Sequence, residues 1–379
     1  MGSASFEGFG LRVVVASDKF KGTLTSAEVA EAVGTGVRRV CPDATVISVP
    51  VADGGDGTLS AAVAAGYTLV PVDASGPTGE PVRSGYARSG HTAVVELADV
   101  SGLVRLPGGV PAPLTATTYG TGELIAAALD AGCTRIVLGI GGSASTDGGR
   151  GLIEALSGNN SSLRDEKVPD RRLAALRRRL DGVQIVVACD VDNPLTGRRG
   201  AAAVYGPQKG ATPQQVAQLD AALGKWADVV ARETGADLRD TPGAGAAGGV
   251  GFAALALLGA ELRPGIELVL EMVRFREKLA GADLVVTGEG ALDEQTLHGK
   301  AVAGVAAASN GVPVVAVCGV NRLSAEQLRG IGVAAAYALT DVEPDVRRCI
   351  AEPRPLLEEL GERLAVEHLT MTRREKGIA

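Results

Sequence analysis

Four short segments of the 379-residue chain place carboxylates between glycines or close to them. They are Val51–Thr58 (VADGGDGT), Gly141–Gly149 (GGSASTDGG), Cys189–Pro194 (CDVDNP) and Thr287–Asp293 (TGEGALD). Three of them directly follow an apolar run, and α/β folds place ligands at the carboxyl ends of their strands. Carboxylate, amide and hydroxyl oxygens suit Mg²⁺, which binds one or two carboxylates together with substrate phosphates. The same oxygens suit structural Ca²⁺, and each Asp-Gly pair is also ordinary turn chemistry, but together the four segments predict a metal or anion site.

Lysines in three further turns supply the opposite charge. The turns are Ser17–Thr23 (SDKFKGT), Gly206–Gly210 (GPQKG) and His298–Lys300 (HGK). A lysine beside a glycine can reach an anionic oxygen as a flexible point charge. Taken singly, each lysine is at least as easily explained as an ordinary solvated surface residue. The prediction that they bind an anion therefore depends on their occurring together with the acidic turns.

Glycine patterns alone leave the type of ligand open. Two segments, 139–144 and 243–248, match G-x-G-x-x-[GA]. With 52 glycines in the chain, roughly one such match is expected by chance, so a nicotinamide-dependent dehydrogenase has little support. The first match follows a predicted strand, where backbone N–H groups ahead of a helix suit an anion. No Walker A motif is present, which excludes a P-loop enzyme.

Composition excludes several classes of partner. Lys and Arg number 37 against 44 Asp and Glu, which gives a net charge of −7 and no basic field for a nucleic acid or an anionic membrane. The five cysteines form no C-x-x-C pair and the three histidines lie far apart, so we expect buried thiols in a reducing compartment and no zinc site. The sequence also has no secretion signal and no apolar run of about 18 residues. We therefore expect a soluble cytoplasmic protein.

Short β-branched runs alternate with Ala/Leu-rich segments of helical length, which predicts an α/β fold with a mostly parallel sheet. The predicted strands cover 12–16, 45–51, 68–72, 93–97, 135–140, 184–188, 284–287, 313–317 and 334–338. The predicted helices cover 26–40, 58–65, 122–131, 213–234, 247–258, 266–280, 301–309 and 344–365.

The regular alternation is interrupted in the middle of the chain. Residues 73–90 are rich in Gly, Pro and Ser, and 106–118 hold three prolines, whereas strand and helix alternate again after about residue 280. We therefore predict one doubly wound domain from residues 11–72 and 281–370, interrupted by a second domain, 73–280, with the active cleft between them. Residues 1–10 and 371–379 are expected to be disordered or left over from cloning.

Seven motifs occur in an order that resembles the bacterial type I glycerate kinase (glycerate 2-kinase) family. They are SDKFKGT, PVADGGDGT, GIGGSASTDGG, CDVDNPLTG, YGPQKGA, GAAGGVGFA and TGEGALDEQTLHGK, and the resemblance runs from about Val13 to Ala365. It implies ATP-dependent phosphorylation of D-glycerate with Mg²⁺, in this family commonly giving 2-phosphoglycerate. It also implies a flavodoxin-like (Rossmann-like) domain built from both chain ends and an inserted α/β domain, and it is compatible with a homodimer.

The resemblance implies roles for individual residues, because phosphoryl transfer needs positioning, a metal and cationic groups. Lys19 and Lys21 would hold the glycerate carboxylate or the transferring phosphate, and Lys300 would offset developing charge. Asp190 or Asp192 would be the base or orient the hydroxyl. The metal ligands would be Glu289 and Asp293. The substrate- and phosphate-binding residues would be Asp53, Asp56, Ser143, Ser145, Asp147, Asp192, Asn193 and Lys209.

One segment departs from the family pattern. Residues 157–170 read SGNNSSLRDEKVPD, a polar stretch without periodicity that predicts a surface loop. Because of this segment, a catalytically impaired homologue that only binds the nucleotide remains an alternative. A kinase for another small hydroxy acid is the second alternative. The sequence does not distinguish the 2-hydroxyl from the 3-hydroxyl as the acceptor.

Overall fold

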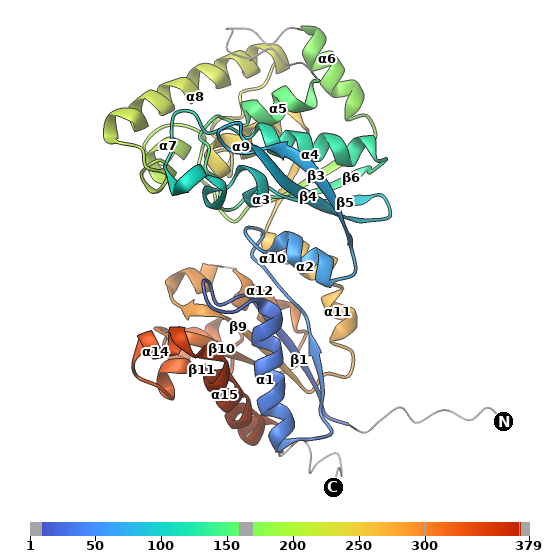
Figure 1. The fold of residues 1–379 in the computed structure, drawn as a ribbon, viewed down its shortest axis with the longest axis vertical. Helices are drawn as coiled ribbons and strands as arrows, with labels where there is room; N and C mark the ends of the chain where they lie inside the picture. The colour runs from blue at the N-terminus through green and yellow to red at the C-terminus, as the bar shows by residue number, and fades with distance from the viewer. Residues whose placement is uncertain (1–9, 159–169, 299, 371, 373–379) are drawn as a thin grey trace, which may run out of the picture. The chain divides into compact units, whose positions relative to one another are not determined.

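The computed structural model describes residues 10–158, 170–298, 300–370 and 372 and divides them into two compact units (Figure 1). Unit 1 comprises the residues up to Ala52 with those from Val269 onward, and unit 2 is Asp53–Leu268. The division lies before the positions inferred from sequence, 72 and 280. The first boundary shifts because α2 (Thr58–Ala64) contacts the sheet of unit 2 and the strand after α2 belongs to that sheet. The expectations for 1–10 and 371–379 fall outside the described residues, except at Gly10 and Thr372.

Unit 1 contains a five-stranded parallel sheet. Its strands are β1 (Arg12–Ser17), β2 (Thr45–Ser48), β9 (Leu284–Leu292), β10 (Val314–Asn321) and β11 (Ala335–Ala338). They are arranged in the order β11-β10-β9-β1-β2, which is the flavodoxin-like order 2-1-3-4-5 when the strands are renumbered within the unit. The predicted fold class is therefore confirmed. The point where the strand order reverses lies between β1 and β9.

Helices α1 (Ser26–Val40) and α15 (Pro353–His368) pack side by side on one face of this sheet (Figure 1). Their apolar side chains form one core with alternate residues of β1, β9 and β10. A Cβ on Gly36 would lie 2.0 Å from the carbonyl oxygen of Glu358, so the close helix crossing requires glycine there. Helix α12 (Ala301–Ala308) contacts β1 and β9. The other helices of unit 1 are α11 (Phe275–Lys278), η4 (Glu294–His298), α13 (Ala325–Gly330), η5 (Leu339–Asp341) and α14 (Val346–Ala351).

The helix predicted over 344–365 is in fact two helices, α14 and α15. Pro353 opens α15, and a proline cannot continue a helix because it lacks an N–H and its ring clashes with the preceding turn. The segment predicted as a helix over 266–280 is likewise divided into α10 (Gly265–Met272) and α11. Arg274 has φ 55° between them, a left-handed conformation that ends the first helix.

Unit 2 contains a six-stranded mixed sheet. Its strands are β3 (Thr68–Ser75), β4 (Pro81–Ser89), β5 (Thr92–Glu96), β6 (Arg135–Gly139), β7 (Gln184–Ala188) and β8 (Glu261–Arg263), and they lie in that order. β3, β4 and β5 pair antiparallel, whereas β5 to β8 are parallel. The segment 73–90, expected as an irregular connection, thus contains β4. A Cβ on Gly85 would lie 2.4 Å from the Val70 carbonyl oxygen, so this glycine serves strand pairing.

The helices of unit 2 enclose a core around the single tryptophan, Trp226 of α8. They are α3 (Ala98–Ser101), η1 (Leu103–Arg105), η2 (Pro107–Gly109), α4 (Tyr119–Asp130), α5 (Arg150–Leu156), α6 (Asp170–Arg179), α7 (Ala201–Tyr205), η3 (Pro207–Lys209), α8 (Pro213–Thr234) and α9 (Ala246–Leu257), with α2 and the first half of α10. Among the described residues no helix is both long enough and apolar enough to span a membrane.

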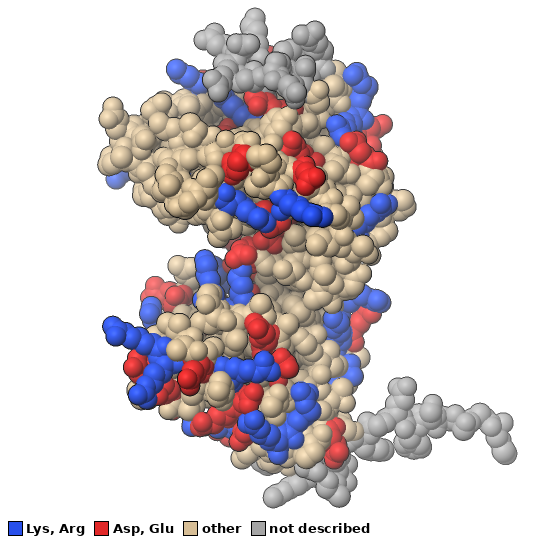
Figure 2. Space-filling model, viewed as in Figure 1, with Lys and Arg blue, Asp and Glu red and all other residues tan. Residues whose placement is uncertain are grey.

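Acidic and basic side chains are interspersed on the drawn face of unit 1 (Figure 2). Arg39 of α1 pairs with Glu358 and Glu362 of α15, and Arg363 pairs with Glu359 on the same helix. Such pairs neutralise one another locally, so this face carries no extended field of one sign, in agreement with the composition.

Candidate active site

Three of the motifs converge at the carboxyl ends of β6 and β7 in unit 2. A Cβ on Gly54 would lie 2.6 Å from the Cβ of Ala188, and a Cβ on Gly141 would lie 2.6 Å from the Cα of Gly55. The turn 53–57 therefore crosses directly over the ends of both strands. No residue with a side chain fits at these contacts, so the glycines are required for the motifs to meet at one edge of the sheet.

Asp190 and Asp53 contribute carboxylates to this edge. Asp190 is exposed, and its Oδ1 accepts a hydrogen bond from the backbone N–H of Gly265 at 2.9 Å. Asp53 is half-buried, and its Oδ1 accepts from Gly55 N at 3.2 Å. Asp56 is exposed on the same turn. The structure thus brings together the candidate base and two of the predicted binding residues.

Asp192 and Asn193 are engaged within their own loop. Asp192 forms an ion pair with Arg199 at 3.1 Å, with both side chains more than two-thirds exposed. The Asn193 amide nitrogen donates to the Arg199 carbonyl oxygen at 2.8 Å, and its Oδ1 accepts from the Tyr205 hydroxyl at 2.6 Å. In this arrangement Asn193 fixes the loop, and the Asp192 carboxylate is paired within it.

Asp147 organises the turn 141–149. Its Oδ2 accepts from Thr118 N, Thr118 Oγ1 and Gly151 N at 2.9, 2.8 and 3.2 Å, and its Oδ1 accepts from Gly149 N at 3.0 Å. Both carboxylate oxygens are therefore bonded by groups at the starts of α4 and α5. We interpret Asp147 as the group that joins these two helix ends.

Lys209 reaches the same turn from η3. It is 2% exposed, and its Nζ donates to Ser143 Oγ at 2.8 Å and to the Ser145 carbonyl oxygen at 2.6 Å. Burial lowers the pKa of Lys209 to about 8, although the nearby Asp147 carboxylate opposes the shift. In the described part of the chain, the buried hydroxyls of Ser145 and Thr146 have no hydrogen-bond partner. This turn therefore collects a buried cation and unsatisfied hydroxyls, which are groups that an anion can satisfy.

The second glycine pattern, 243–248, packs against this turn. A Cβ on Gly248 would lie 2.1 Å from the Ser145 carbonyl oxygen, and a Cβ on Gly249 would lie 2.7 Å from the Cα of Gly148. Gly148 N also donates to the Gly248 carbonyl oxygen at 2.9 Å. These glycines allow two backbones to touch, which explains the pattern without a dinucleotide.

Two features of this edge were missed from sequence. Glu96 ends β5, is 5% exposed and accepts from Gly57 N and Leu59 N; burial raises its pKa. The sequence feature that could have identified Glu96 is an acidic residue directly after an apolar run. Trp226 Nε1 donates to the Gly148 carbonyl oxygen at 3.0 Å, and the Arg150 guanidinium lies 4.7 Å from the ring centroid. No spacing in the sequence indicated that contact.

The remaining predicted residues lie in unit 1. The ends of β1 and β9 meet at the reversal of strand order, where Asp18 N donates to the Gly288 carbonyl oxygen at 2.8 Å, and α/β folds place ligands at such positions. Lys19 is half-buried beside this contact, Lys21 is exposed, and Lys300 donates to Gln295 Oε1 at 2.6 Å.

Thr296 links the two candidate metal ligands, Glu289 and Asp293. Its hydroxyl donates to Glu289 Oε1 at 2.5 Å and accepts from Asp293 N at 3.1 Å. No group of three or more His, Cys, Asp and Glu residues that could bind a metal occurs among the residues the structure describes. The carboxylates of Glu289 in β9 and Asp293 just after it, with the Thr296 hydroxyl of η4, are nevertheless hard oxygen donors. Mg²⁺ takes its other ligands from water and phosphates, so the set fits that ion.

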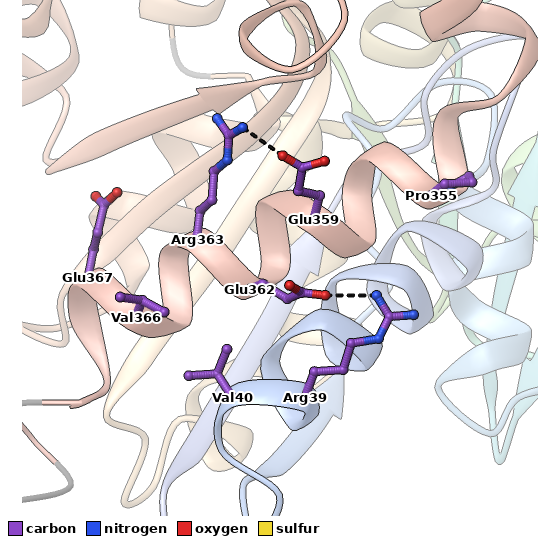
Figure 3. Close-up of a pocket in the computed structure, with 8 residues that line it drawn as sticks. All are labelled: Arg39, Val40, Pro355, Glu359, Glu362, Arg363, Val366 and Glu367. Atoms are coloured by element: carbon purple, nitrogen blue, oxygen red, sulfur yellow. Dashed lines mark hydrogen bonds and ion pairs between the residues drawn. The ribbon is translucent and has the colours of Figure 1, made fainter.

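A surface pocket in unit 1 lies apart from these motifs (Figure 3). It is lined by α1 and α15, with Val40 and Val366 beside charged side chains, and contains none of the predicted site residues. The charges of Arg39 and Arg363 are paired with glutamates of α15. The pocket therefore offers no chemistry to the site.

Comparison with known proteins agrees with the resemblance inferred from the motifs. The model of the glycerate kinase family matches residues 13–368. A glycerate kinase of Bacillus subtilis (strain 168) is 46% identical over 324 residues, which cover 82% of this chain and 85% of that protein. A glycerate 2-kinase of Escherichia coli (strain K12) is 42% identical with the same coverage, 82% and 85%. A crystal structure from Salmonella typhimurium LT2, assigned as glycerate kinase 2, superposes with a TM-score of 0.78 at 39% identity and covers 96% of this chain and 100% of that one. This chain belongs to the glycerate kinase family.

Proposed function

We propose that this protein transfers a phosphoryl group from ATP to the 2-hydroxyl of D-glycerate, giving 2-phosphoglycerate. The observation that carries the proposal is the convergence of the turns 53–57, 141–149 and 189–194 at one edge of the unit 2 sheet, with the buried Lys209 bonded to Ser143. The relatives named glycerate kinase and glycerate 2-kinase support it.

Within unit 2, the turn 141–149 binds an oxyanion of the substrate, and Asp190 orients the reacting hydroxyl or accepts its proton. Asp190 is exposed and held at one oxygen by Gly265 N, so its carboxylate is oriented and accessible to a hydroxyl proton. Asp192 is the alternative base; its carboxylate pairs with Arg199 within its own exposed loop. Asp53 and Asp56 lie on the turn above and orient the substrate.

Within unit 1, Lys19, Lys21 and Lys300 contact anionic oxygens, and Glu289 and Asp293 hold Mg²⁺ directly or through water. Bound there, the ion would neutralise charge on the phosphates during transfer. The chain's own contribution is to orient the two carboxylates through the Thr296 hydroxyl, which bonds Glu289 and accepts from Asp293 N.

Phosphorus NMR of the product formed from D-glycerate and MgATP tests the proposal. A 2-phosphoglycerate signal is expected. Product at the 3-position would correct the acceptor, and absence of product with a panel of small hydroxy acids would support the catalytically impaired alternative. Phosphorylation of another hydroxy acid in preference to glycerate would favour the second alternative.

Cellular context extends this proposal. The five cysteines are free thiols, four of them buried, as expected in a reducing compartment, so we assign the activity to the cytoplasm, where ATP is available. A homodimer is the assembly that we propose, and sedimentation velocity of the purified chain tests it.

A further inference from the structure

Lys209 carries a buried positive charge without a fixed counter-ion. Its side chain is 2% exposed, and its Nζ is bonded to a hydroxyl and a carbonyl oxygen. In the described part of the chain no carboxylate forms an ion pair with it, since Asp147 acts only through its field and gives its oxygens to Thr118, Gly149 and Gly151. Burying an unpaired charge is costly. The folded protein therefore accepts a cost at this turn that a bound anion would remove.

The charge of Lys209 decides what Ser143 can do. An ammonium group has no lone pair and can only donate, so Ser143 Oγ must accept from Nζ and its own O–H remains available to another acceptor. A neutral amine can accept from that O–H, and the hydroxyl would then be taken up within the protein. Ser143 is 6% exposed and follows the exposed Gly142, so its hydroxyl lies close to the surface of the turn.

We propose that Lys209 is a positioning residue that keeps the Ser143 hydroxyl available as a donor to a substrate oxyanion, and that binding of this oxyanion is accompanied by proton uptake at Lys209. The inference rests on the proposed function in one respect, that the turn 141–149 binds an anionic group. The anionic group is a carboxylate or a phosphate. Titration with D-glycerate, which carries a carboxylate, and separately with ADP, which carries phosphates, distinguishes the two.

The direction of the pH effect follows from the groups around Lys209. Burial lowers its pKa to about 8 in the free protein, and an anion nearby favours the ammonium form and raises that pKa. Anion binding should therefore take up a proton above about pH 8 and weaken as pH rises. On α4 and α5, whose starts Asp147 joins, the Tyr119 phenol has its pKa raised by burial and stays protonated, and the Arg150 guanidinium stays charged. Asp147 opposes the lowered pKa of Lys209 without reversing it.

Isothermal titration calorimetry at pH 8.5 in two non-phosphate buffers of different ionisation enthalpy measures the proton uptake. We expect roughly half a proton or more with one of the two titrants, and almost none at pH 6.5. Lys225→Met, at an exposed lysine of α8, is the matched control and should keep the uptake. Lys209→Met should abolish it, and Lys209→Arg, if it folds, should bind without it.

Ser143→Ala supplies a test that does not depend on how Lys209 variants fold. It should weaken binding of the same titrant on the order of tenfold at pH 7 but much less at pH 9.5, where the wild-type hydroxyl is already taken up by the neutral amine. If binding is too weak for calorimetry, the KM of that substrate replaces Kd and should rise above about pH 8 with kcat unchanged.

Absence of proton uptake with both titrants, or a pH-independent KM for both substrates, would overturn the inference, as would an equal penalty for Ser143→Ala at both pH values. Product formation at pH 7 together with no proton uptake at pH 8.5 would contradict this inference alone. Proton uptake without any product would contradict the proposed function and leave the inference standing.

Discussion

Replacement of Asp147 by Asn should destabilise unit 2, because this carboxylate joins the starts of two helices. Its Oδ2 accepts four hydrogen bonds, from Thr117 Oγ1, Thr118 N, Thr118 Oγ1 and Gly151 N, and its Oδ1 accepts one from Gly149 N. An amide has a single acceptor oxygen. If that oxygen takes the place of Oδ2, the amide nitrogen faces the Gly149 N–H and two donors are opposed.

The magnitude follows from these bonds. A hydrogen bond to a charged group contributes about 1.5–3 kcal/mol and a neutral one about 1, and a buried donor without a partner costs about 1–3 kcal/mol. The substitution leaves Gly149 N without an acceptor and weakens the four hydrogen bonds to Oδ2. Because Asp147 is itself half-buried, water compensates in part, and we expect a loss of about 2–3 kcal/mol in the free energy of unfolding.

Urea unfolding followed by tryptophan fluorescence measures this loss. Trp226 is the single tryptophan of the chain, and its Nε1 donates to the carbonyl oxygen of Gly148, next to Asp147. Asp130→Asn is the control, since the 71% exposed Asp130 pairs with Arg179 at the surface and should cost less than about 1 kcal/mol. A free energy of unfolding for Asp147→Asn within about 0.5 kcal/mol of the wild type, at the same m value, would refute the assigned role.

Four further substitutions test the site and the fold. Asp190→Asn should reduce kcat by about a hundredfold or more with little change in nucleotide affinity, measured by coupled ADP release and calorimetry; unchanged kcat would remove Asp190 from the mechanism. Glu289→Gln should raise the Mg²⁺ concentration for half-maximal activity by about tenfold, and an unchanged midpoint in a Mg²⁺ titration would exclude Glu289 as a ligand. Burial raises the pKa of Glu96 above 4.5, so the stability that the neutral carboxyl contributes is present below pH 4.5 and is lost as the pH rises through the folded-state pKa. Glu96→Gln should not show this loss of stability. A difference in urea midpoint between the variant and the wild type that does not change with pH would contradict the prediction. Gly36→Ala should cost about 1–3 kcal/mol of stability by overpacking α1 against α15, and an unchanged midpoint of thermal unfolding would show that the helices can separate.

Local sequence rules predicted the elements whose ends are fixed by local chemistry. The predicted helices 26–40 and 213–234 coincide with α1 and α8, and both begin with a capping box, in which Thr25 pairs with Glu28 and Thr212 with Gln215. The strand β4 escaped prediction because Pro81 and Gly85 resemble turn residues. Only the pairing with β3, which places the Val70 carbonyl oxygen where a Cβ of residue 85 would lie, shows why a glycine occupies a strand.

The sequence indicated the candidate residues as a set, but not what each of them contacts. Asp147 and Asp190 both follow Gly-rich or apolar runs. The Asp147 carboxylate accepts five hydrogen bonds from backbone and hydroxyl groups, whereas Asp190 is exposed at a strand end and accepts one from Gly265 N. Lys209 and Lys21 both sit beside glycine in sequence, but Lys209 is buried and Lys21 is exposed. The residue type determines which chemistry a side chain can perform, whereas the neighbouring groups determine whether that side chain binds a ligand or stabilises the fold.

The glycines serve both the fold and the ligand-binding turn. Gly248 and Gly249 touch the backbone of the turn 145–148, and Gly55 touches Gly141 at its beginning. Because no side chains separate these three segments, the turn that carries Ser143 cannot shift without displacing both neighbours. Close backbone packing therefore holds the Ser143 and Lys209 pair in place, and the abundance of glycine reflects the construction of an anion-binding turn from main chain that is fixed on both sides.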